Sequence, residues 1–172
     1  KIFLSHINSK SHIQNLLASI IIISLFFDLN DISKNIFLDF KPPEGRGDIS
    51  KLKFKKKLIN FVDESYNSNP LSLRTALINF ANIKTEKNLK HVLLGDMLEL
   101  GKDSSKHHLS MTNLLNKLKI DKVHILGKEI KKTYQGLRLN KKGLVLRDIV
   151  QINDLINKKL SNKDYLMIKG SN

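Results

Sequence analysis

Side chains suited to binding chemistry are concentrated in residues 63–70, which read Asp-Glu-Ser-Tyr-Asn-Ser-Asn-Pro. The mostly apolar residues 58–62 before them predict a buried strand, and apolar spacing in residues 71–77 predicts a helix capped by Asn69. In open α/β sheets, ligands bind where the carboxyl end of a strand leads into a helix. Two carboxylates and two Asn amides there could hold hydroxyl groups, a metal ion or the edge of a base. A well-capped loop without a ligand is the alternative that this segment alone leaves open.

The sequence lacks the residues that several other kinds of chemistry require. The sequence contains neither a Gly-x-x-x-x-Gly-Lys-Ser/Thr phosphate loop nor a Gly-x-Ser-x-Gly nucleophile elbow. It has no Cys, which excludes disulfides and thiolate metal sites. His107 and His108 are adjacent, so on a helix they point about 100° apart and cannot hold one ion together. We therefore expect no metal site and assign no catalytic residue.

The composition describes a globular chain with a strong positive charge. Of 172 residues, 41% are hydrophobic, and 30 Lys and Arg against 16 Asp and Glu give a formal net charge of +14. This charge favours anionic partners, but proteins that bind single-stranded nucleic acid interleave aromatic and basic residues, and aromatic residues are only 6% here. We expect no nucleic-acid partner, while a basic nucleic-acid-binding α/β module remains an alternative.

The most apolar stretch is residues 16–27, which predict a buried helix ending at Asp28. Its twelve residues are too few for a membrane-spanning helix, which needs about 20, so no membrane association is expected. A short strand at residues 2–4 and a second helix at residues 31–39 are predicted on either side of it. Two Pro and two Gly in residues 41–47 then mark a domain boundary.

Beyond this boundary, strands and helices alternate. Residues 51–55 alternate Lys with apolar side chains, which predicts a half-exposed edge strand. Further strands are predicted at residues 58–62, 91–96, 123–127, 143–146 and 165–169, with helices between them and an Asp148–Gln151 capping box. This order indicates an α/β fold with a Rossmann-like, mostly parallel sheet covered by helices on both faces.

Residues 63–70 resemble the Asp-Asp-Ser-Tyr-Asn-Ala-Asn-Pro signature of Mur ligases, with Glu64 in place of the second Asp. Three further segments match in the right order, namely 45–46 (Gly-Arg), 94–101 (Leu-Gly-Asp-Met-Leu-Glu-Leu-Gly) and 168–171 (Ile-Lys-Gly-Ser). An Asn-Leu-Leu-Ala-Ser segment at residues 15–19 extends the match over nearly the whole chain. The chain is identified as a member of the Mur ligase family.

The resemblance implies an ATP-dependent ligase that forms an amide bond through an acyl phosphate in peptidoglycan precursor synthesis. The branch it resembles joins D-alanyl-D-alanine to UDP-N-acetylmuramoyl-tripeptide, with ATP and Mg²⁺, as a cytoplasmic monomer. Residues 1–45 would be the end of the central ATP-binding domain, and residues 46–172 a truncated C-terminal domain. The phosphate loop and Mg²⁺ ligands would precede residue 1, so this fragment is expected to be inactive alone. A ligase similar to folylpolyglutamate synthase is the alternative within the superfamily.

The resemblance also assigns candidate site residues. On the ATP side they are Asn15, Arg46, Asp63, Asn67 and Asn69, and on the substrate side Asp96, Met97, Lys169 and Ser171. A guanidinium such as that of Arg46 suits phosphate, because its planar donors bind two oxygens together. The segment before Asn15 departs from the family pattern, since Ser9, Ser11 and His12 stand where the family has Gly, His and Asn.

Overall fold

The computed structural model describes residues 10–38 and 44–171. The chain divides into two compact units, Lys1–Pro43 and Glu44–Asn172, and each is described by itself. The strand predicted at residues 2–4 lies outside the described residues. The assignment of the first unit to an ATP-binding domain stays a prediction.

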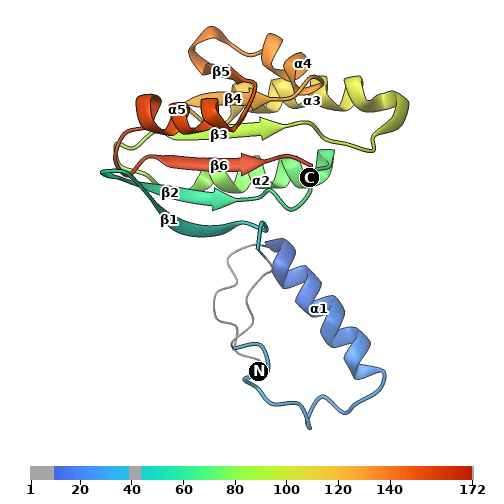
Figure 1. Cartoon of the computed structure of the whole chain (residues 1–172). Coiled ribbons are helices and arrows are strands. Elements are labelled where there is room, and N and C mark those ends of the chain that lie inside the picture. The colour runs from blue at the N-terminus through green and yellow to red at the C-terminus, as the bar shows by residue number, and fades with distance from the viewer. Residues whose placement is uncertain (1–9, 39–43, 172) are drawn as a thin grey trace. The chain divides into compact units, whose positions relative to one another are not determined.

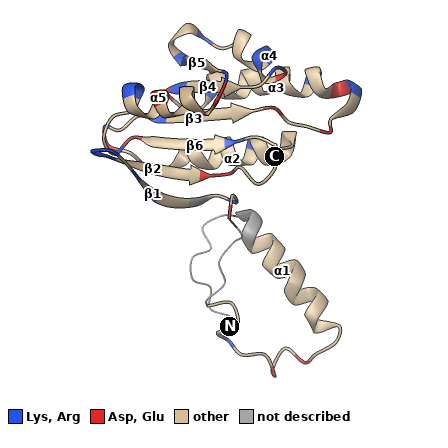
Figure 2. Ribbon diagram, viewed as in Figure 1, with Lys and Arg blue, Asp and Glu red and all other residues tan. Residues whose placement is uncertain are grey.

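The first unit contains helix α1 (Lys10–Ser24), which is almost devoid of charge (Figure 2). The prediction of a buried helix is wrong within the described residues, since large apolar side chains on and after α1 are mostly exposed, including Ile21 at 63% and Phe26 at 75%. The helix begins earlier than predicted and ends at Ser24, before Asp28. The apolar side chains of α1 are concentrated in its second half, from Leu16 to Ile23.

The helix predicted at residues 31–39 is absent from the described part of that range, where residues 31–38 form bends and turns. Short polar side chains explain the difference. The amide of Asn30 donates to Asp28 Oδ1 at 2.8 Å, and the amide of Asn35 donates to Ser33 Oγ at 3.2 Å. Such local bonds compete with the helical hydrogen-bond ladder and stabilise turns.

The second unit is built on a six-stranded sheet with the order β1-β2-β6-β3-β4-β5 (Figure 1). The strands are β1 (Asp48–Phe54), β2 (Lys57–Asp63), β3 (Lys90–Gly95), β4 (Lys122–Leu126), β5 (Lys142–Leu146) and β6 (Tyr165–Lys169). Only the edge strand β1 is antiparallel to its neighbour, and the other pairs are parallel. The predicted α/β class and mostly parallel sheet are confirmed.

Helices cover both faces of this sheet. One core cluster joins the sheet to α2 (Pro70–Asn82), α3 (Ser104–Lys117) and α4 (Ile130–Gln135), with Leu77, Leu115 and Ile130 fully buried. A second cluster joins the opposite face to α5 (Ile149–Lys159), with Leu155 fully buried. Two short 3₁₀ turns, η1 (Gly101–Asp103) and η2 (Leu139–Lys141), complete the unit.

Helix capping sets where the loops of the carboxyl edge end. Asn69 Oδ1 accepts from the amide of Ser72 at 2.8 Å, and Ser72 Oγ accepts from the amide of Asn69 at 3.0 Å, so α2 begins with a capping box. Asp148 Oδ1 accepts from the amide of Gln151 at 2.9 Å at the start of α5. The cap at Asn69 agrees with the sequence prediction. At Asp148 only half of the predicted capping box forms, because Gln151 Oε1 accepts from the amide of Arg147 and not from that of Asp148.

The last strand lies in the middle of the sheet. Tyr165 of β6 pairs with Asn60 on one side and with Lys90 on the other. Residues 169–171 therefore emerge between the loop after β2 and the loop after β3. The approach is close, since a Cβ on Gly95 would lie 3.2 Å from the Cα of Gly170.

Candidate functional site

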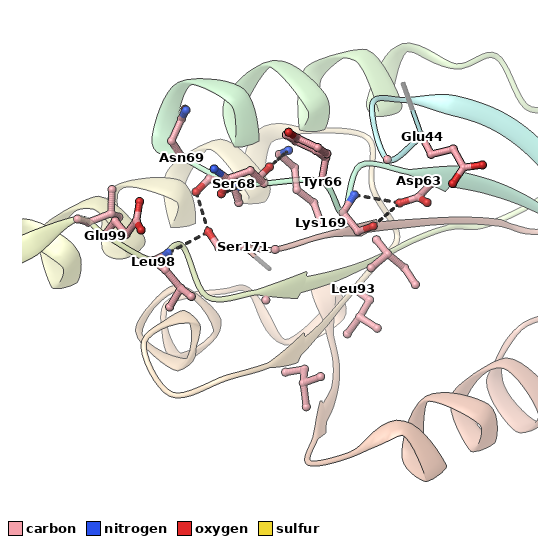
Figure 3. A pocket seen from close by; sticks show the side chains of 18 of the residues that line it. Glu44, Asp63, Tyr66, Ser68, Asn69, Leu93, Leu98, Glu99, Lys169 and Ser171 are labelled. Carbon is pink, nitrogen blue, oxygen red and sulfur yellow. Dashed lines mark hydrogen bonds between the residues drawn. The ribbon is translucent and has the colours of Figure 1, made fainter. Parts of the chain in front are cut away.

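A cavity of about 1000 Å³ opens at the carboxyl ends of β2, β6 and β3 (Figure 3). Five of the predicted site residues line it, namely Asp63, Asn67, Asn69, Lys169 and Ser171. The sequence did not single out other residues of the lining, including Ser65, Tyr66, Ser68, Leu98, Glu99 and Ile152. Most of these residues belong to the matching motifs, so only their position next to an assigned site residue could have indicated that they line the cavity. Ile152 lies on α5 and carried no such signal.

The carboxylate of Asp63 is partly committed to its own loop. Its Oδ1 accepts from the amide of Ser65 at 2.9 Å and from Ser65 Oγ at 2.6 Å, a turn typical of Asp after a strand. Within the described part of the chain, Oδ2 has no hydrogen-bond partner. Asp63 therefore presents one free acceptor oxygen at the cavity.

The two Asn side chains add donors beside this acceptor. Asn67 Oδ1 accepts from the amide of Ser68 at 2.6 Å, and Asn69 Oδ1 accepts from the amide of Ser72 at 2.8 Å. Because each oxygen faces an N–H group, each Nδ2 group is left as the donor end. Neither Nδ2 donates to another described residue. An open acceptor beside two amide donors suits a ligand that carries both hydroxyl groups and acceptor atoms.

Lys169 binds the backbone of the loop after β2. Its Nζ donates to the carbonyls of Asn67 at 2.8 Å and Glu64 at 3.2 Å, and lies 3.4 Å from Glu64 Oε2. The side chain is only 3% exposed, and burial lowers the pKa of Lys169 while the Glu64 carboxylate opposes that shift. Its hydrogen bonds in this structure go to the loop backbone and Glu64, so Lys169 positions residues 64–67.

Ser171 joins the two loops that flank β6. Its Oγ donates to the carbonyl of Ser68 at 3.0 Å and accepts from the amide of Leu98 at 3.0 Å (Figure 3). Its backbone amide donates to the carbonyl of Asp96 at 2.9 Å. One hydroxyl thus sets the distance between the two walls of the cavity.

Asp96 does not line the cavity. Its two carboxylate oxygens accept from the amides of Ile130 at 2.8 Å and Lys128 at 2.9 Å, which fixes the loop between β4 and α4. Gly127 in that loop has φ +145°, and a Cβ on it would collide with the Asp96 carboxylate. Asp96 thus connects two loops. Both of its carboxylate oxygens are bound to backbone amides, and its assignment to the substrate side stays a prediction.

Met97 is 1% exposed and packs in the core, so its side chain does not reach the cavity. Its backbone amide donates to Nε2 of the buried His108 at 3.0 Å, and His108 Nδ1 donates to the carbonyl of Ser104 at 2.8 Å. These bonds define the tautomer of His108 and hold the loop after β3. His107 makes no such bond to that loop.

Arg46 lies against the binding loop. Its guanidinium carbon is 4.3 Å from the ring centroid of Tyr66, a cation–π contact. The carbonyl of Gly45 accepts from the amide of Tyr66 at 3.2 Å, and Gly45 has φ +75°, where a Cβ would lie 2.8 Å from the Tyr66 nitrogen.

Asn15 is an exposed residue of α1 in the first unit. Its nucleotide-side assignment stays a prediction.

Residues 10–38 and 44–171 hold no group of three or more His, Cys, Asp or Glu that could bind a metal ion together. Within the same ranges, no helix is both long and apolar enough to cross a membrane.

Comparison with protein families matches residues 51–172 to the Mur ligase, glutamate ligase domain. MurF from Acinetobacter baumannii is 24% identical with a TM-score of 0.70, over 93% of this chain and 34% of that one. The MurF ligase from Thermotoga maritima in complex with ADP is 22% identical with a TM-score of 0.73, over 99% of this chain and 37% of that one. UDP-N-acetylmuramate-alanine ligase MurC from Thermotoga maritima is 16% identical with a TM-score of 0.65, over 96% of this chain and 35% of that one. The chain therefore spans about a third of the length of these proteins and shares their fold over that part.

Proposed function

The chain belongs to the Mur ligase family, and we propose that its second unit closes one side of the nucleotide site of an ATP-dependent amide-forming ligase in peptidoglycan precursor synthesis. The observation that carries this proposal is the cavity at the carboxyl ends of β2, β6 and β3. There Asp63 Oδ2 is open as an acceptor, and Asn67 and Asn69 present amide donors. Such a set suits a nucleoside, whose ribose hydroxyls donate and whose base and oxygens accept.

Each candidate site residue has a separate role in this proposal. Asp63 accepts a ribose hydroxyl, while Asn67 and Asn69 donate to nucleotide acceptors. Lys169 and Ser171 hold the loop in the binding shape. Arg46 leaves the ring of Tyr66 and places its guanidinium on a phosphate, which it can bind through two N–H groups. The nucleotide, with Mg²⁺, supplies the phosphoryl group that activates a carboxylate.

The specific reaction we propose joins D-alanyl-D-alanine to UDP-N-acetylmuramoyl-tripeptide. It is supported by the order of the four motifs along the chain and by the fold shared with MurF proteins. Catalysis of this type depends mainly on positioning the reactants and neutralising charge. In the same proposal, residues 1–45 end the ATP-binding domain and the chain alone does not catalyse the reaction.

Nucleotide binding by the chain itself tests the site. We expect ADP to shift the backbone amide resonances of residues 63–69 saturably, and Asp63→Ala to weaken binding about tenfold, as for one lost hydrogen bond to a charged group. Lys53→Ala, an exposed charge loss on β1, should change the affinity less than twofold. ADP shifts that avoid residues 63–69, or equal weakening by both variants, would contradict the proposed site.

Turnover tests the reaction. The protein that contains this chain should release ADP from ATP only when UDP-N-acetylmuramoyl-tripeptide and D-alanyl-D-alanine are both present. ADP release that instead requires a folate and glutamate would assign it to the folylpolyglutamate synthase type. Steeply salt-dependent binding to generic DNA without ADP release would favour the nucleic-acid-binding alternative.

A further inference from the structure

The segment that leads into β1 is bound closely to the loop after β2, and we call its residues 45–47 the strap. The carbonyl of Gly45 accepts from the amide of Tyr66 at 3.2 Å, and the amide of Gly47 donates to the carbonyl of Asp63 at 2.7 Å. Both glycines have positive φ, and a Cβ on Gly45 would lie 2.8 Å from the Tyr66 nitrogen. The backbone of the strap is therefore fixed against the loop that lines the cavity.

The middle residue of the strap, Arg46, carries its charge beside this loop. Its side chain is exposed, and its guanidinium carbon lies 4.3 Å from the ring centroid of Tyr66. Within residues 10–38 and 44–171 the guanidinium makes no hydrogen bond or ion pair. Burial lowers the pKa of Lys169, Glu64 opposes that shift, and the positive charge of Arg46 adds to it. The guanidinium is therefore within electrostatic reach of the Lys residue that binds the loop backbone.

The ring of Tyr66 attracts the guanidinium without occupying its N–H groups, because a cation–π contact uses the charge alone. These N–H groups remain available to a phosphate, which can accept from two of them together. Tyr66 itself is 58% exposed and lines the cavity (Figure 3). An exposed contact of this kind corresponds to a factor of about two to five in an equilibrium constant. It favours one position of Arg46 and is still weak enough for a phosphate to replace it.

We propose that the Tyr66 ring is a latch, which holds Arg46 on the strap while the site is empty and releases it to a diphosphate or triphosphate group. The latch rests on the proposed function, which places Arg46 on a phosphate. A contact that exists only in the unliganded state opposes binding by its own free energy. Tyr66 therefore lowers the affinity for ADP but not for adenosine, and this favours release of the ADP product.

Nuclear Overhauser effects between the side-chain protons of Arg46 and the ring protons of Tyr66 report on the latch directly. In the isotope-labelled 172-residue chain we expect them without ligand and with adenosine. Saturating ADP or pyrophosphate should abolish them. Lys142 and Tyr134 are the internal control, because Lys142 Nζ lies 5.4 Å from the Tyr134 ring centroid in a contact far from the strap in sequence. Effects within that pair should persist with every probe.

Affinities measured by titration test the consequence of the latch. Tyr66→Leu should strengthen ADP binding by about two- to fivefold and leave adenosine binding unchanged. Tyr66→Phe keeps the ring and should bind ADP as the unsubstituted chain does. In an Arg46→Ala background, Tyr66→Leu should have no further effect on ADP. Arg74→Ala removes an exposed Arg from α2 and is the control for loss of one charge, with ADP affinity expected to stay within about twofold.

The probes separate failure of the latch from failure of the nucleotide site. Weaker ADP binding in Tyr66→Leu, equal changes for ADP and adenosine, or Overhauser effects that persist at saturating ADP would overturn the latch. Shifts at residues 63–69 with ADP, but without release of Arg46, would leave the nucleotide site and remove the latch. Release of Arg46 by pyrophosphate without any ADP shift at residues 63–69 would do the reverse. No response to either probe would overturn both.

Discussion

The two edges of the sheet use the same residue types differently. At the carboxyl edge, polar side chains hold the loops and leave donors, acceptors and cations open around the cavity. At the amino edge, polar side chains are buried or half-buried and bind backbone groups of the same unit. The difference shows that the cationic residues behind the net charge of +14 do not all belong to one ligand-binding surface. Part of it stabilises the fold and part of it is available for ligands.

Three Lys residues of the amino edge lie at the ends of helices, where backbone carbonyls lack helical partners. Lys57 Nζ donates to carbonyls at the end of α5, including that of Leu160 at 2.6 Å. Lys90 Nζ donates to the carbonyl of Ala81 at the end of α2 at 2.5 Å, and Lys141 Nζ donates to the carbonyl of Ile120 just after α3 at 2.7 Å. Ammonium groups at helix C-termini also interact favourably with the helix dipole. Burial lowers the pKa of Lys90 and Lys141.

A buried His pair, His91 and His124, connects β3 to β4. His124 Nδ1 accepts from the amide of Leu144 at 2.9 Å, so Nε2 carries its proton and faces His91 Nδ1 at 3.1 Å. His91 Nε2 then carries a proton toward Asp164 Oδ2, 3.7 Å away, which is too long for a hydrogen bond. Both rings are neutral in this arrangement. A further proton would displace one of these bonds.

Asp164→Ala should have the largest effect on stability and would confirm the structural role of the amino edge. Asp164 is buried and accepts from the amides of Leu89 at 2.9 Å and Ser161 at 2.7 Å. Leaving these donors unpaired should lower the free energy of unfolding by about 3 kcal/mol in urea denaturation. Asp164→Asn retains one acceptor oxygen and should cost less. Equal losses for the two variants would show that the hydrogen bonds are not what matters.

Acidification should destabilise the fold through the His pair. Burial lowers the pKa of His124 to about 3, with the nearby His91 and Lys122 adding to the shift. Burial also lowers the pKa of His91, against an opposing effect of Asp164. In the unfolded chain both pKa values are about 6.5. Below that pH the unfolded state binds protons that the folded state does not, so stability present above about pH 6.5 falls as pH falls.

Each such His contributes about 1.4 kcal/mol per pH unit, so His124 alone should cost about 2 kcal/mol between pH 6.5 and pH 5. Urea unfolding at pH 7.5 and pH 5 measures this loss. His124→Gln should reduce the pH dependence, whereas His107→Gln, outside the pair, should leave it unchanged. A pH dependence that survives in His124→Gln would assign it to other groups.

Lys57→Met tests helix capping by Lys with an intermediate effect. Met keeps most of the apolar stem but removes the ammonium that binds carbonyls of Ile156, Asn157 and Leu160. We expect the free energy of unfolding to fall by about 1.5 kcal/mol. The same change at the exposed Lys53 of β1 should cost less than about 0.5 kcal/mol. Similar costs at both positions would remove the distinction between structural and surface Lys.

Ser171→Ala should have the smallest effect on global stability, at most about 1 kcal/mol, because it removes a single hydroxyl and Leu98, one of its two partners, is exposed. Its effect should appear locally at the carboxyl edge. Amide hydrogen exchange at Leu98 should become faster, since that amide loses its acceptor. Ser110→Ala on α3 is the control and should leave exchange at Leu98 unchanged. Unaltered exchange in Ser171→Ala would show that this hydroxyl does not join the two loops.

Sequence alone was sufficient for the features that arise from nearby residues. Alternating strands and helices, the edge strand β1, the caps at Asn69 and Asp148 and the strand at residues 165–169 all follow from periodicity and short-range hydrogen bonds. The motif matches also identified the family. The helix predicted at residues 31–39 failed because Asp, Asn and Ser side chains there stabilise turns.

Only the tertiary structure decided what the site residues do. Lys169 binds the carbonyl of Glu64 across 105 positions, and Ser171 binds the amide of Leu98 across 73 positions. These bonds exist because β6 lies between β2 and β3, an order that no local pattern specifies. Asp96 is likewise committed by a loop more than thirty positions away. Periodicity and caps are properties of neighbours in sequence, whereas the partner of a polar group depends on which strands the fold makes adjacent.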